Sequence, residues 1–453
     1  MSLTLGQIRG ALEGAIPAIQ ATCDMDGVPN ITFLSQVQYV DEKHIALSYQ
    51  FFSKTRRNIL ANPHSQMTVV HPLTSQIYRM RLRYLHTQSS GPLFEQMRAQ
   101  LEGIASHTGM AGVFRLRGSD VHEVCEVEAV PCATLPLPDA ARNPLAALRR
   151  TSEKLTACVD LGSLLDTLLD MLVQEFGVEQ ALLLMHDEGG SRLYTVGSRG
   201  YASSGVGSEI AMGDGVIGVC AQARTAIRIN WMTHAYRYSQ TIRDSVLQDG
   251  MGNALKTAIP YPGLIDPQSQ LGVPLLRGSK VLGVLLVESQ KELRFTYDDE
   301  DALVALAGQA SACIDALREQ AEDAAEAMPA NRRAVPFGPT PANGPTLSVR
   351  RYCGTDSIFL DNEYLIKGVA GAILWRLLTL HCNTGRTEFT NRELRLEASL
   401  RLPDVTDNLE ARLILLRRRL NEQASGLELQ KSGRGQLRLV VSRPLALQEV
   451  SAG

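Results

Sequence analysis

The sequence predicts an α+β protein built from three domains, and three observations lead to this prediction. The chain has 453 residues, which is more than a single hydrophobic core normally supports. Two proline-rich segments, residues 131–144 and 329–345, interrupt it. The first stretch alternates like an antiparallel sheet, whereas the other two mix helical and strand periodicities. The predicted domains are therefore residues 1–130, 145–325 and 346–445.

The overall composition is that of an ordinary globular protein. Hydrophobic residues make up 44% of the chain and charged residues 21%, with a net charge of −3 and a pI ≈ 6.3. This balance predicts neither non-specific nucleic-acid binding nor membrane attachment by the whole molecule. The N-terminus lacks a signal-peptide pattern, and no apolar run reaches the roughly 20 residues that a membrane span needs. Eight scattered cysteines without a CxxC pair argue against a zinc site or a disulfide framework and for a reducing, cytoplasmic location, and no metal site is predicted.

Short alternating segments predict a small β-barrel in the first domain. The predicted strands are residues 30–41, 44–50, 65–70, 77–84 and 111–118, with a helix at 91–107. Within 77–84, Met80 and Leu82 share one face of the strand, while three arginines share the other. The segment "FFSKTRRNILANP" places hydroxyls and cations at a helix start. Such residues suit phosphate, because phosphate oxygens are charged acceptors and a helix N-terminus attracts anions.

This order of strands, with "SKTRR" opening a helix that ends in Asn62-Pro63, resembles the flavin-binding split barrel of the pyridoxamine-phosphate oxidase-like families over residues 14–125. The resemblance implies a homodimer with flavin mononucleotide (FMN) at the subunit interface, although some such barrels bind haem or no cofactor. The tryptophan-containing C-terminal signature of the true oxidases is absent, so their activity is not expected. The alternative for "SKTRR" is a solvated helix start. The cofactor-binding residues implied are Ser53, Lys54, Thr55 and Arg57 for phosphate, Ser35 and Gln36 for the isoalloxazine, and Gln50.

The second domain begins with an amphipathic helix over residues 160–177. Asp160 is its predicted N-cap and Gly177 its stop, and the expected buried stripe is Leu164, Leu165, Leu168, Leu169 and Leu172. A Gly-rich phrase, "GDGVIGV", predicts a further helix start and not a phosphate loop, because no GKS or GKT follows. A hairpin with its turn at Gly278-Ser279 and a long helix over 298–323 complete the pattern.

This order of elements, with the phrases "GDGVIGV" and "VPLLRGSKVLGVLLVES", resembles a GAF α/β sandwich. The resemblance implies a small-molecule ligand on one face of the sheet, beneath the excursion at residues 230–269. The alternative is a packed loop without a ligand. The candidate ligand-binding residues are the aromatic and polar side chains Trp231, His234, Tyr236, Tyr238 and Arg243.

Strands, three helices and then a hairpin with "SGRG" at its tip predict a winged helix-turn-helix in the third domain. It resembles the DNA-binding output domain of response regulators. The third helix, residues 404–423, is expected to bury the stripe Leu409, Leu413, Leu416 and Leu420 and to expose its arginines. The domain carries 16 Lys and Arg against 11 Asp and Glu, a balance of +5. The alternative is a solvated or protein-binding surface. The candidate DNA-binding residues are Asn408, Arg412, Arg418, Arg419, Lys431 and Arg434.

Taken together, these patterns predict a homodimeric transcription regulator that responds to a ligand or to redox state, and they leave open whether the protein is also an enzyme. A receiver domain is missing, and the two N-terminal domains take its sensory place. The alternatives are a flavin-dependent oxidoreductase with accessory domains, a haem-binding sensor, and a signalling scaffold that binds no DNA.

Overall fold

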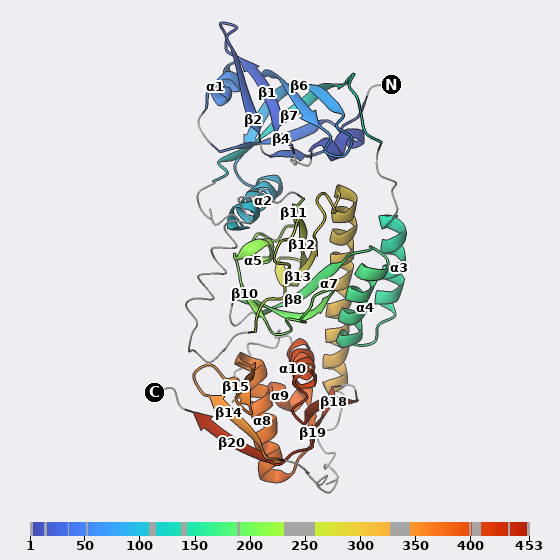
Figure 1. Ribbon diagram of the computed structural model, residues 1–453, viewed down its shortest axis with the longest axis vertical. Helices are drawn as coiled ribbons and strands as arrows, with labels where there is room; N and C mark the ends of the chain where they lie inside the picture. The colour runs from blue at the N-terminus through green and yellow to red at the C-terminus, as the bar shows by residue number, and fades with distance from the viewer. Residues whose placement is uncertain are drawn as a thin grey trace.

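The structure is a computed structural model that describes residues 3–12, 16–34, 36–50, 53–107, 115–136, 143–187, 191–230, 259–326, 345–397, 400, 409–433 and 435–450, with the backbone alone at 104–107 and 321–326. Three bodies follow one another along its long axis, in the order of the sequence (Figure 1). Among the described helices, none is both long and apolar enough to cross a membrane.

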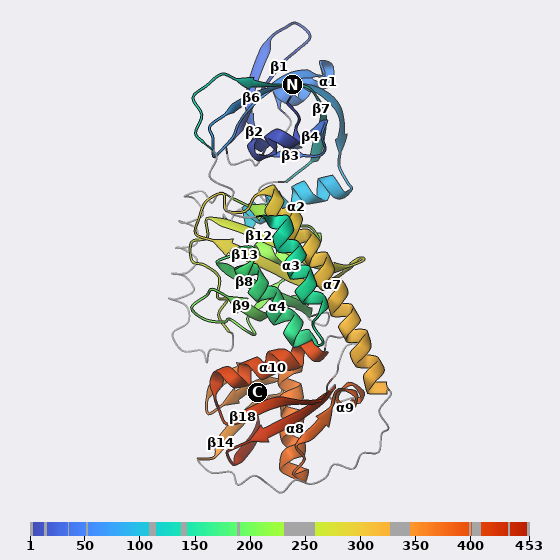
Figure 2. The ribbon, with the colours of Figure 1, turned by 90° about the vertical axis from the view of Figure 1, so that its right-hand side faces the viewer.

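The N-terminal body is a seven-stranded antiparallel sheet that curls round on itself (Figure 2). Its strands lie in the order β2-β1-β5-β6-β7-β4-β3. Ile45, Met67 and Met80 are fully buried inside the curl. The strands are β1 Ala18–Cys23, β2 Pro29–Leu34, β3 Val37–Tyr39, β4 His44–Tyr49, β5 His64–Val70, β6 Ile77–Gln88 and β7 Gly118–Val130, and the helices are η1 Gly6–Leu12, α1 Lys54–Ala61 and α2 Pro92–His107.

The alternation predicted for residues 77–84 is confirmed. Met80 and Leu82 are buried, while the arginines of β6 form ion pairs with glutamates of β7 on the outside. Three strand predictions differ from the structure. The last strand begins at Gly118 instead of residue 111, residues 30–41 are divided between β2 and β3, and β1 was not predicted.

The middle body is a six-stranded sheet in the order β10-β9-β8-β13-β12-β11. Helices α4 and α7 cover one face, with α3 packed against both of them, and α5 covers the other face. Helix α2 leaves the barrel and packs against α5, so that Ala99 joins the core on that side (Figure 1). The elements are α3 Pro144–Thr156, α4 Leu161–Gln174, β8 Gln180–Asp187, β9 Arg192–Arg199, β10 Glu209–Ala211, α5 Gly215–Ala223, β11 Ile227–Ile229, β12 Ser269–Arg277, β13 Lys280–Ser289 and α7 Tyr297–Glu326.

Helix α7 connects the three bodies. At its N-terminal end, Tyr297 donates its hydroxyl to the Leu12 carbonyl over 3.4 Å, and its ring centre lies 4.2 Å from the guanidinium carbon of Arg9. Arg9 also forms an ion pair of 2.8 Å with Asp301. The other end of α7 reaches the C-terminal body and contacts α9 (Figure 2).

The C-terminal body has two small sheets around three helices. One sheet has the order β16-β15-β14-β20, with β20 parallel to β14, and the other has the order β17-β19-β18. The sequence-based boundary at 445 omits β20. The elements are β14 Leu347–Tyr352, β15 Ser357–Leu360, β16 Glu363–Ile366, α8 Gly368–Thr384, β17 Glu388–Thr390, α9 Asn391–Leu396, α10 Leu409–Gln423, β18 Leu427–Gly433, β19 Gln436–Val441 and β20 Leu445–Val450.

Local sequence signals in the second and third domains are confirmed. Asp160 caps α4 by accepting from the Ser163 amide, and the predicted leucine stripe of α4 is buried. Thr390 and Glu393 form the two reciprocal hydrogen bonds of a capping box at α9. The leucine stripe of α10 is buried as well.

Candidate functional sites

A cavity of about 270 Å³ lies at the N-terminus of α1 in the barrel. Its walls come from β1, β2, β4, β7 and α1. Three of the residues predicted to hold a cofactor, Gln50, Ser53 and Thr55, line this cavity. The cavity is at the small end of the range of about 300–1,000 Å³ that is usual for ligand pockets.

Two hydroxyl side chains occupy the helix start. Ser53 is the N-cap of α1, and its Oγ accepts from the Arg56 amide over 3.3 Å. Thr55 is buried, and its Oγ1 accepts from the Asn30 side-chain amide over 2.8 Å. Both hydroxyls therefore lie at the positive end of the helix dipole, where an anion is stabilised.

The cation that lines the cavity is Arg56, which the sequence analysis did not select. Its guanidinium is ion-paired with Asp120 of β7 and donates to Thr87 Oγ1 over 2.8 Å. Thr87 Oγ1 donates in turn to Asp120 over 2.6 Å. The side chains of Arg56 and Asp120 are only 13% and 8% exposed. Because Arg56 and Asp120 neutralise each other, the groups at this helix start that could attract an anion are the two hydroxyls and the helix N-terminus.

His122 of β7 also lines the cavity. It is fully buried, and its Nδ1 lies 2.9 Å from the Asp120 carbonyl oxygen. Its Nε2 has no hydrogen-bond partner among the described residues. Burial lowers the pKa of His122 below the ordinary value of 6.5, so the imidazole is neutral at neutral pH. Although His122 lines the cavity, its Nε2 has almost no accessible surface, so a bound molecule could reach this nitrogen only if the side chains around it moved.

The other predicted cofactor residues lie elsewhere. Gln36 is turned toward α2, where its amide donates to the Met97 carbonyl over 3.1 Å and to Gln100 over 3.2 Å. Lys54 and Arg57 belong to α1 but do not line the cavity. Ser35 lies outside the described residues.

On the α5 side of the middle sheet, a carboxyl group is buried. Glu288 of β13 is 1% exposed and accepts from the Tyr201 hydroxyl over 2.7 Å and from the Leu264 amide over 3.1 Å. Gln270 of β12 donates its side-chain amide to the same carboxyl. Burial raises the pKa of Glu288 above its ordinary value. The five predicted ligand residues, Trp231, His234, Tyr236, Tyr238 and Arg243, lie outside the described residues.

The predicted DNA-reading helix, α10, packs against the middle domain. Arg412 was expected on an exposed strip, and this expectation is wrong because the residue is 4% exposed. Its guanidinium forms an ion pair of 2.6 Å with Asp187 at the end of β8 and lies 5.6 Å from the centre of the Tyr194 ring.

Arg418 does point away from the core of its own domain, but it points into the neighbouring one. It forms an ion pair of 3.0 Å with Asp166 of α4 and donates to the Val196 carbonyl of β9. Burial of its guanidinium lowers the pKa of Arg418. Arg419, also expected to be exposed, donates to the Leu365 carbonyl over 3.1 Å and pairs with Glu422 at 2.7 Å.

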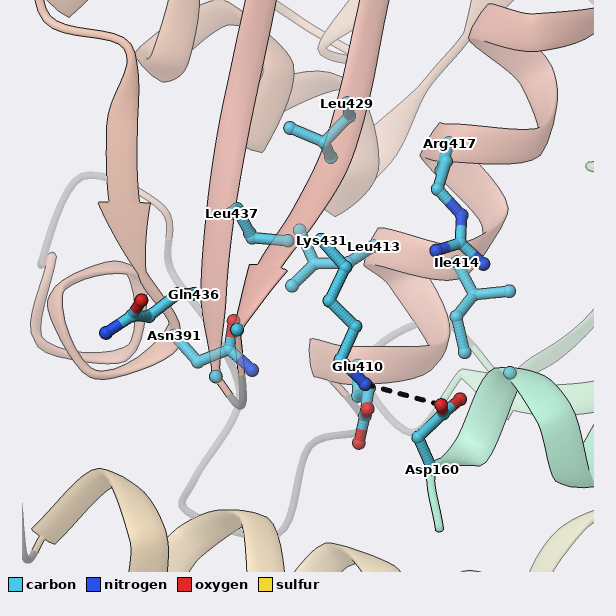
Figure 3. Close-up of a pocket in the computed structure, with 13 residues that line it drawn as sticks. Asp160, Asn391, Glu410, Leu413, Ile414, Arg417, Leu429, Lys431, Gln436 and Leu437 are labelled. Atoms are coloured by element: carbon cyan, nitrogen blue, oxygen red, sulfur yellow. Dashed lines mark ion pairs between the residues drawn. The ribbon is translucent and has the colours of Figure 1, made fainter. Parts of the chain in front are cut away.

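The hairpin β18–β19 also approaches the middle domain. Lys431 extends toward the N-terminal end of α4 and forms an ion pair of 3.6 Å with Asp160, with Glu410 beside it (Figure 3). Asn408 and Arg434 lie outside the described residues.

One sequence signal foreshadowed this packing. In "LILL", residues 413–416, four consecutive positions of α10 are apolar, and a helix that is apolar on several faces is buried on several faces. Ile414 and Leu415 fall beside the predicted core stripe, and both are buried. The core stripe of α10 explains why Leu413 and Leu416 are apolar. Ile414 and Leu415 lie outside that stripe and indicated that a second surface covers the helix.

Comparison with known proteins identifies the middle domain. A family profile described as GAF domain matches residues 160–314. No match is found among curated proteins.

Solved structures resemble parts of the chain. The GAF domain of the phosphoenolpyruvate-protein phosphotransferase from Acinetobacter is 23% identical, with a TM-score of 0.31, over 39% of this chain and 94% of that chain. The free methionine-R-sulfoxide reductase from Neisseria meningitidis is 18% identical, with a TM-score of 0.32, over 41% of this chain and 96% of that chain.

Two further structures cover smaller shares of this chain. An FMN-binding protein from Syntrophomonas wolfei is 17% identical, with a TM-score of 0.23, over 27% of this chain and 88% of that chain. HupZ from Group A Streptococcus is 21% identical, with a TM-score of 0.23, over 29% of this chain and 97% of that chain. At these identities and TM-scores, none of the four carries an argument about function.

Proposed function

We propose that this chain, whose residues 160–314 form a GAF domain, is a ligand-responsive transcription regulator. In this proposal the barrel and the GAF domain bind the ligands to which the protein responds, and the C-terminal domain binds DNA as a winged helix. The observation that carries it is the order of the C-terminal elements. Helices α8, α9 and α10 precede the hairpin β18–β19, in a segment with a charge balance of +5.

The barrel cavity supports FMN as the ligand of the N-terminal domain. Ser53 and Thr55 sit at a helix start, where a phosphate group accepts hydrogen bonds from hydroxyls and backbone amides. Bound FMN would supply redox chemistry, and the residues of this chain would hold and orient it. Haem is the alternative ligand, but the Nε2 of His122 has almost no accessible surface and could not bind its iron without a rearrangement of the barrel. An absorbance spectrum of the purified protein distinguishes flavin from haem.

An exposed apolar patch supports a homodimer. Ile19 of β1 lies opposite Phe33 of β2, Ile31 lies on the same face, and their exposures are 39%, 73% and 68%. Phe33 also borders the cavity. A second copy covering this patch would therefore complete the cavity as well, which agrees with its small volume in one chain.

Helix α7 provides a physical connection from sensor to output. It contacts the barrel through Tyr297 and Asp301, packs on the GAF sheet, and reaches α9. A ligand that stabilises one arrangement of the barrel or the GAF domain can therefore bias the C-terminal domain, provided that it binds the two arrangements with different affinities.

The regulator proposal is tested with the full-length chain and a fluorescent duplex from its own promoter region. Fluorescence anisotropy is measured at two salt concentrations, with a shuffled duplex of equal length as the control. We expect a preference for the promoter duplex and an affinity that falls as salt rises, because bound cations release counterions from DNA. Equal binding of the two duplexes would contradict the proposal.

A flavin-dependent oxidoreductase is the second candidate, because the cavity would expose a bound flavin to a small substrate. Turnover of NAD(P)H by flavin-loaded protein, together with equal binding of promoter and shuffled duplexes, would favour it.

The phosphate assignment is tested with Ser53→Asp. Aspartate caps a helix as well as serine does, so the fold is retained. Its carboxylate repels phosphate, however, so FMN affinity should fall at least about tenfold, whereas riboflavin, which lacks the phosphate, should bind unchanged. Isothermal titration of both ligands checks this. Equal FMN affinity in variant and wild type would contradict phosphate binding at this helix start.

A further inference from the structure

We infer that the GAF domain covers the face of α10 that would contact DNA, so that this structure is an autoinhibited state. The inference rests on the proposed function, because it requires α10 to be the helix that enters DNA. It goes further by identifying the contact that prevents binding, namely the contact of α10 with α4, β8 and β9, called here the α10–GAF contact.

Two arginines of α10 are paired with carboxylates of the GAF domain. Arg412 is paired with Asp187 at 2.6 Å, and Arg418 with Asp166 at 3.0 Å. The side chains of the two arginines are 5% and 17% exposed. An arginine that reads a base edge or contacts a phosphate needs the same guanidinium hydrogens. GAF binding and DNA binding at these residues are therefore mutually exclusive.

Further cations of the C-terminal domain have the same type of partner. Lys431 of β18 pairs with Asp160 at 3.6 Å, and Lys367, just before α8, pairs with Glu209 at 3.0 Å. Together with Asp166 and Asp187, these carboxylates give the GAF surface four negative charges facing cations of the C-terminal domain. DNA would present phosphates to the same cations, so the GAF surface competes through the same chemistry.

Close packing excludes DNA sterically as well. Gly162 and Gly207 of the GAF domain face α10, and a Cβ added at these positions would lie 3.8 Å from Ile414 and 3.7 Å from Leu415. Ile414 and Leu415 belong to the same continuous hydrophobic core as α4 and the GAF sheet. A duplex is far wider than the space left by these contacts, so binding requires the C-terminal domain to separate from the GAF surface.

The test weakens the α10–GAF contact from the GAF side and leaves every C-terminal residue unchanged. The variant is Asp166→Ala/Asp187→Ala in the full-length chain. Without these carboxylates, two guanidinium groups would stay largely buried in the closed state without the counter-charges they have in wild type, and this favours the open state. The matched control is Asp170→Ala, because Asp170, like Asp166, lies on α4 and pairs with Arg199, but forms no ion pair with α10 among the described residues.

Binding is measured by anisotropy with the promoter duplex, and α10 is followed by amide hydrogen exchange without DNA. We expect the double variant to bind the duplex roughly tenfold more tightly or better than wild type, because a larger fraction is competent to bind. Exchange in residues 409–423 should be faster in the double variant. The Asp170→Ala control should match wild type in both measurements.

The outcome that contradicts autoinhibition differs from the outcome that contradicts DNA binding. If wild type and the double variant bind the promoter duplex equally well, while exchange in α10 increases, autoinhibition is wrong and the regulator proposal survives. If exchange in α10 increases but neither protein distinguishes the promoter duplex from a shuffled one, DNA binding itself is wrong, and the inference falls with it. If exchange does not change and affinity does not change, the two carboxylates do not hold α10, and the inference is also overturned.

Discussion

The barrel cavity and the α10–GAF contact both bring arginines, carboxylates and hydrogen-bonding groups together, but their arginines are paired in different ways. In the cavity, Arg56 and Asp120 neutralise each other, while the hydroxyl residues Ser53 and Thr55 line about 270 Å³ of space. In the α10–GAF contact, Arg412 and Arg418 have carboxylate partners from a neighbouring domain.

The two regions show that a cation-rich motif can have different fates in the folded chain. In "SKTRR" the predicted cations Lys54 and Arg57 lie away from the cavity, and the unpredicted Arg56 is inside it but already paired. In α10 the predicted cations are in place, but the chain itself occupies them. A motif therefore indicates which chemistry is present, and the partners in the folded chain decide whether that chemistry is available to a ligand.

The largest effect is expected when the paired charge of the cavity is broken. Arg56→Ala leaves Asp120 buried without its cation and should lower the free energy of unfolding of the barrel by about 3 kcal/mol. The matched control is Arg81→Ala on the outside of β6, where the pair with Glu126 is exposed and loss should cost under about 1 kcal/mol. Amide hydrogen exchange of β6 and β7 against urea concentration measures both. Similar losses in the two variants would contradict the buried role of Arg56.

A smaller effect is expected from pH. Burial lowers the pKa of His122 below 6.5, so the unfolded chain takes up this proton at a higher pH than the folded chain does. Stability is therefore intact above about pH 6.5 and falls as the pH decreases below it, by at most about 1.4 kcal/mol per pH unit from this group. His122→Gln should remove that part of the slope, whereas His64→Gln, at an exposed position of β5, should not. Urea unfolding at pH 7.5 and 5.5 compares the variants, and an unchanged slope in His122→Gln would refute a buried neutral imidazole.

Local signals predicted much of the fold because they act within a few residues. The cap at Asp160, the capping box at Thr390 and the hairpin turn at Gly278 depend on the backbone next to them, and the structure has all three. Strand β20 was missed because its partner, β14, lies almost a hundred residues earlier in the chain. No local period reveals such a pairing.

The sites were harder to predict for the same reason. The orientation of Arg56 depends on Asp120, which comes from β7, and the burial of Arg412 depends on Asp187 in another domain. Helical periodicity placed both arginines on their helices, but it contains no information about which neighbour meets them. The apolar pair Ile414 and Leu415 was the signal in the sequence that pointed to the second partner of α10.

In this proposal α10 binds either the GAF surface or DNA, and never both at once. The most direct measurement is amide hydrogen exchange of the wild-type, full-length chain with and without the promoter duplex at saturating concentration. The GAF segment 191–209 contains the Val196 carbonyl and the loop that contacts Leu415. We expect amide exchange in residues 191–209 to become faster when DNA binds, although DNA does not contact this segment. Residues 409–423 should stay protected, because the duplex then covers them. Unchanged exchange in residues 191–209 with DNA bound would show that α10 remains docked and would contradict the claim.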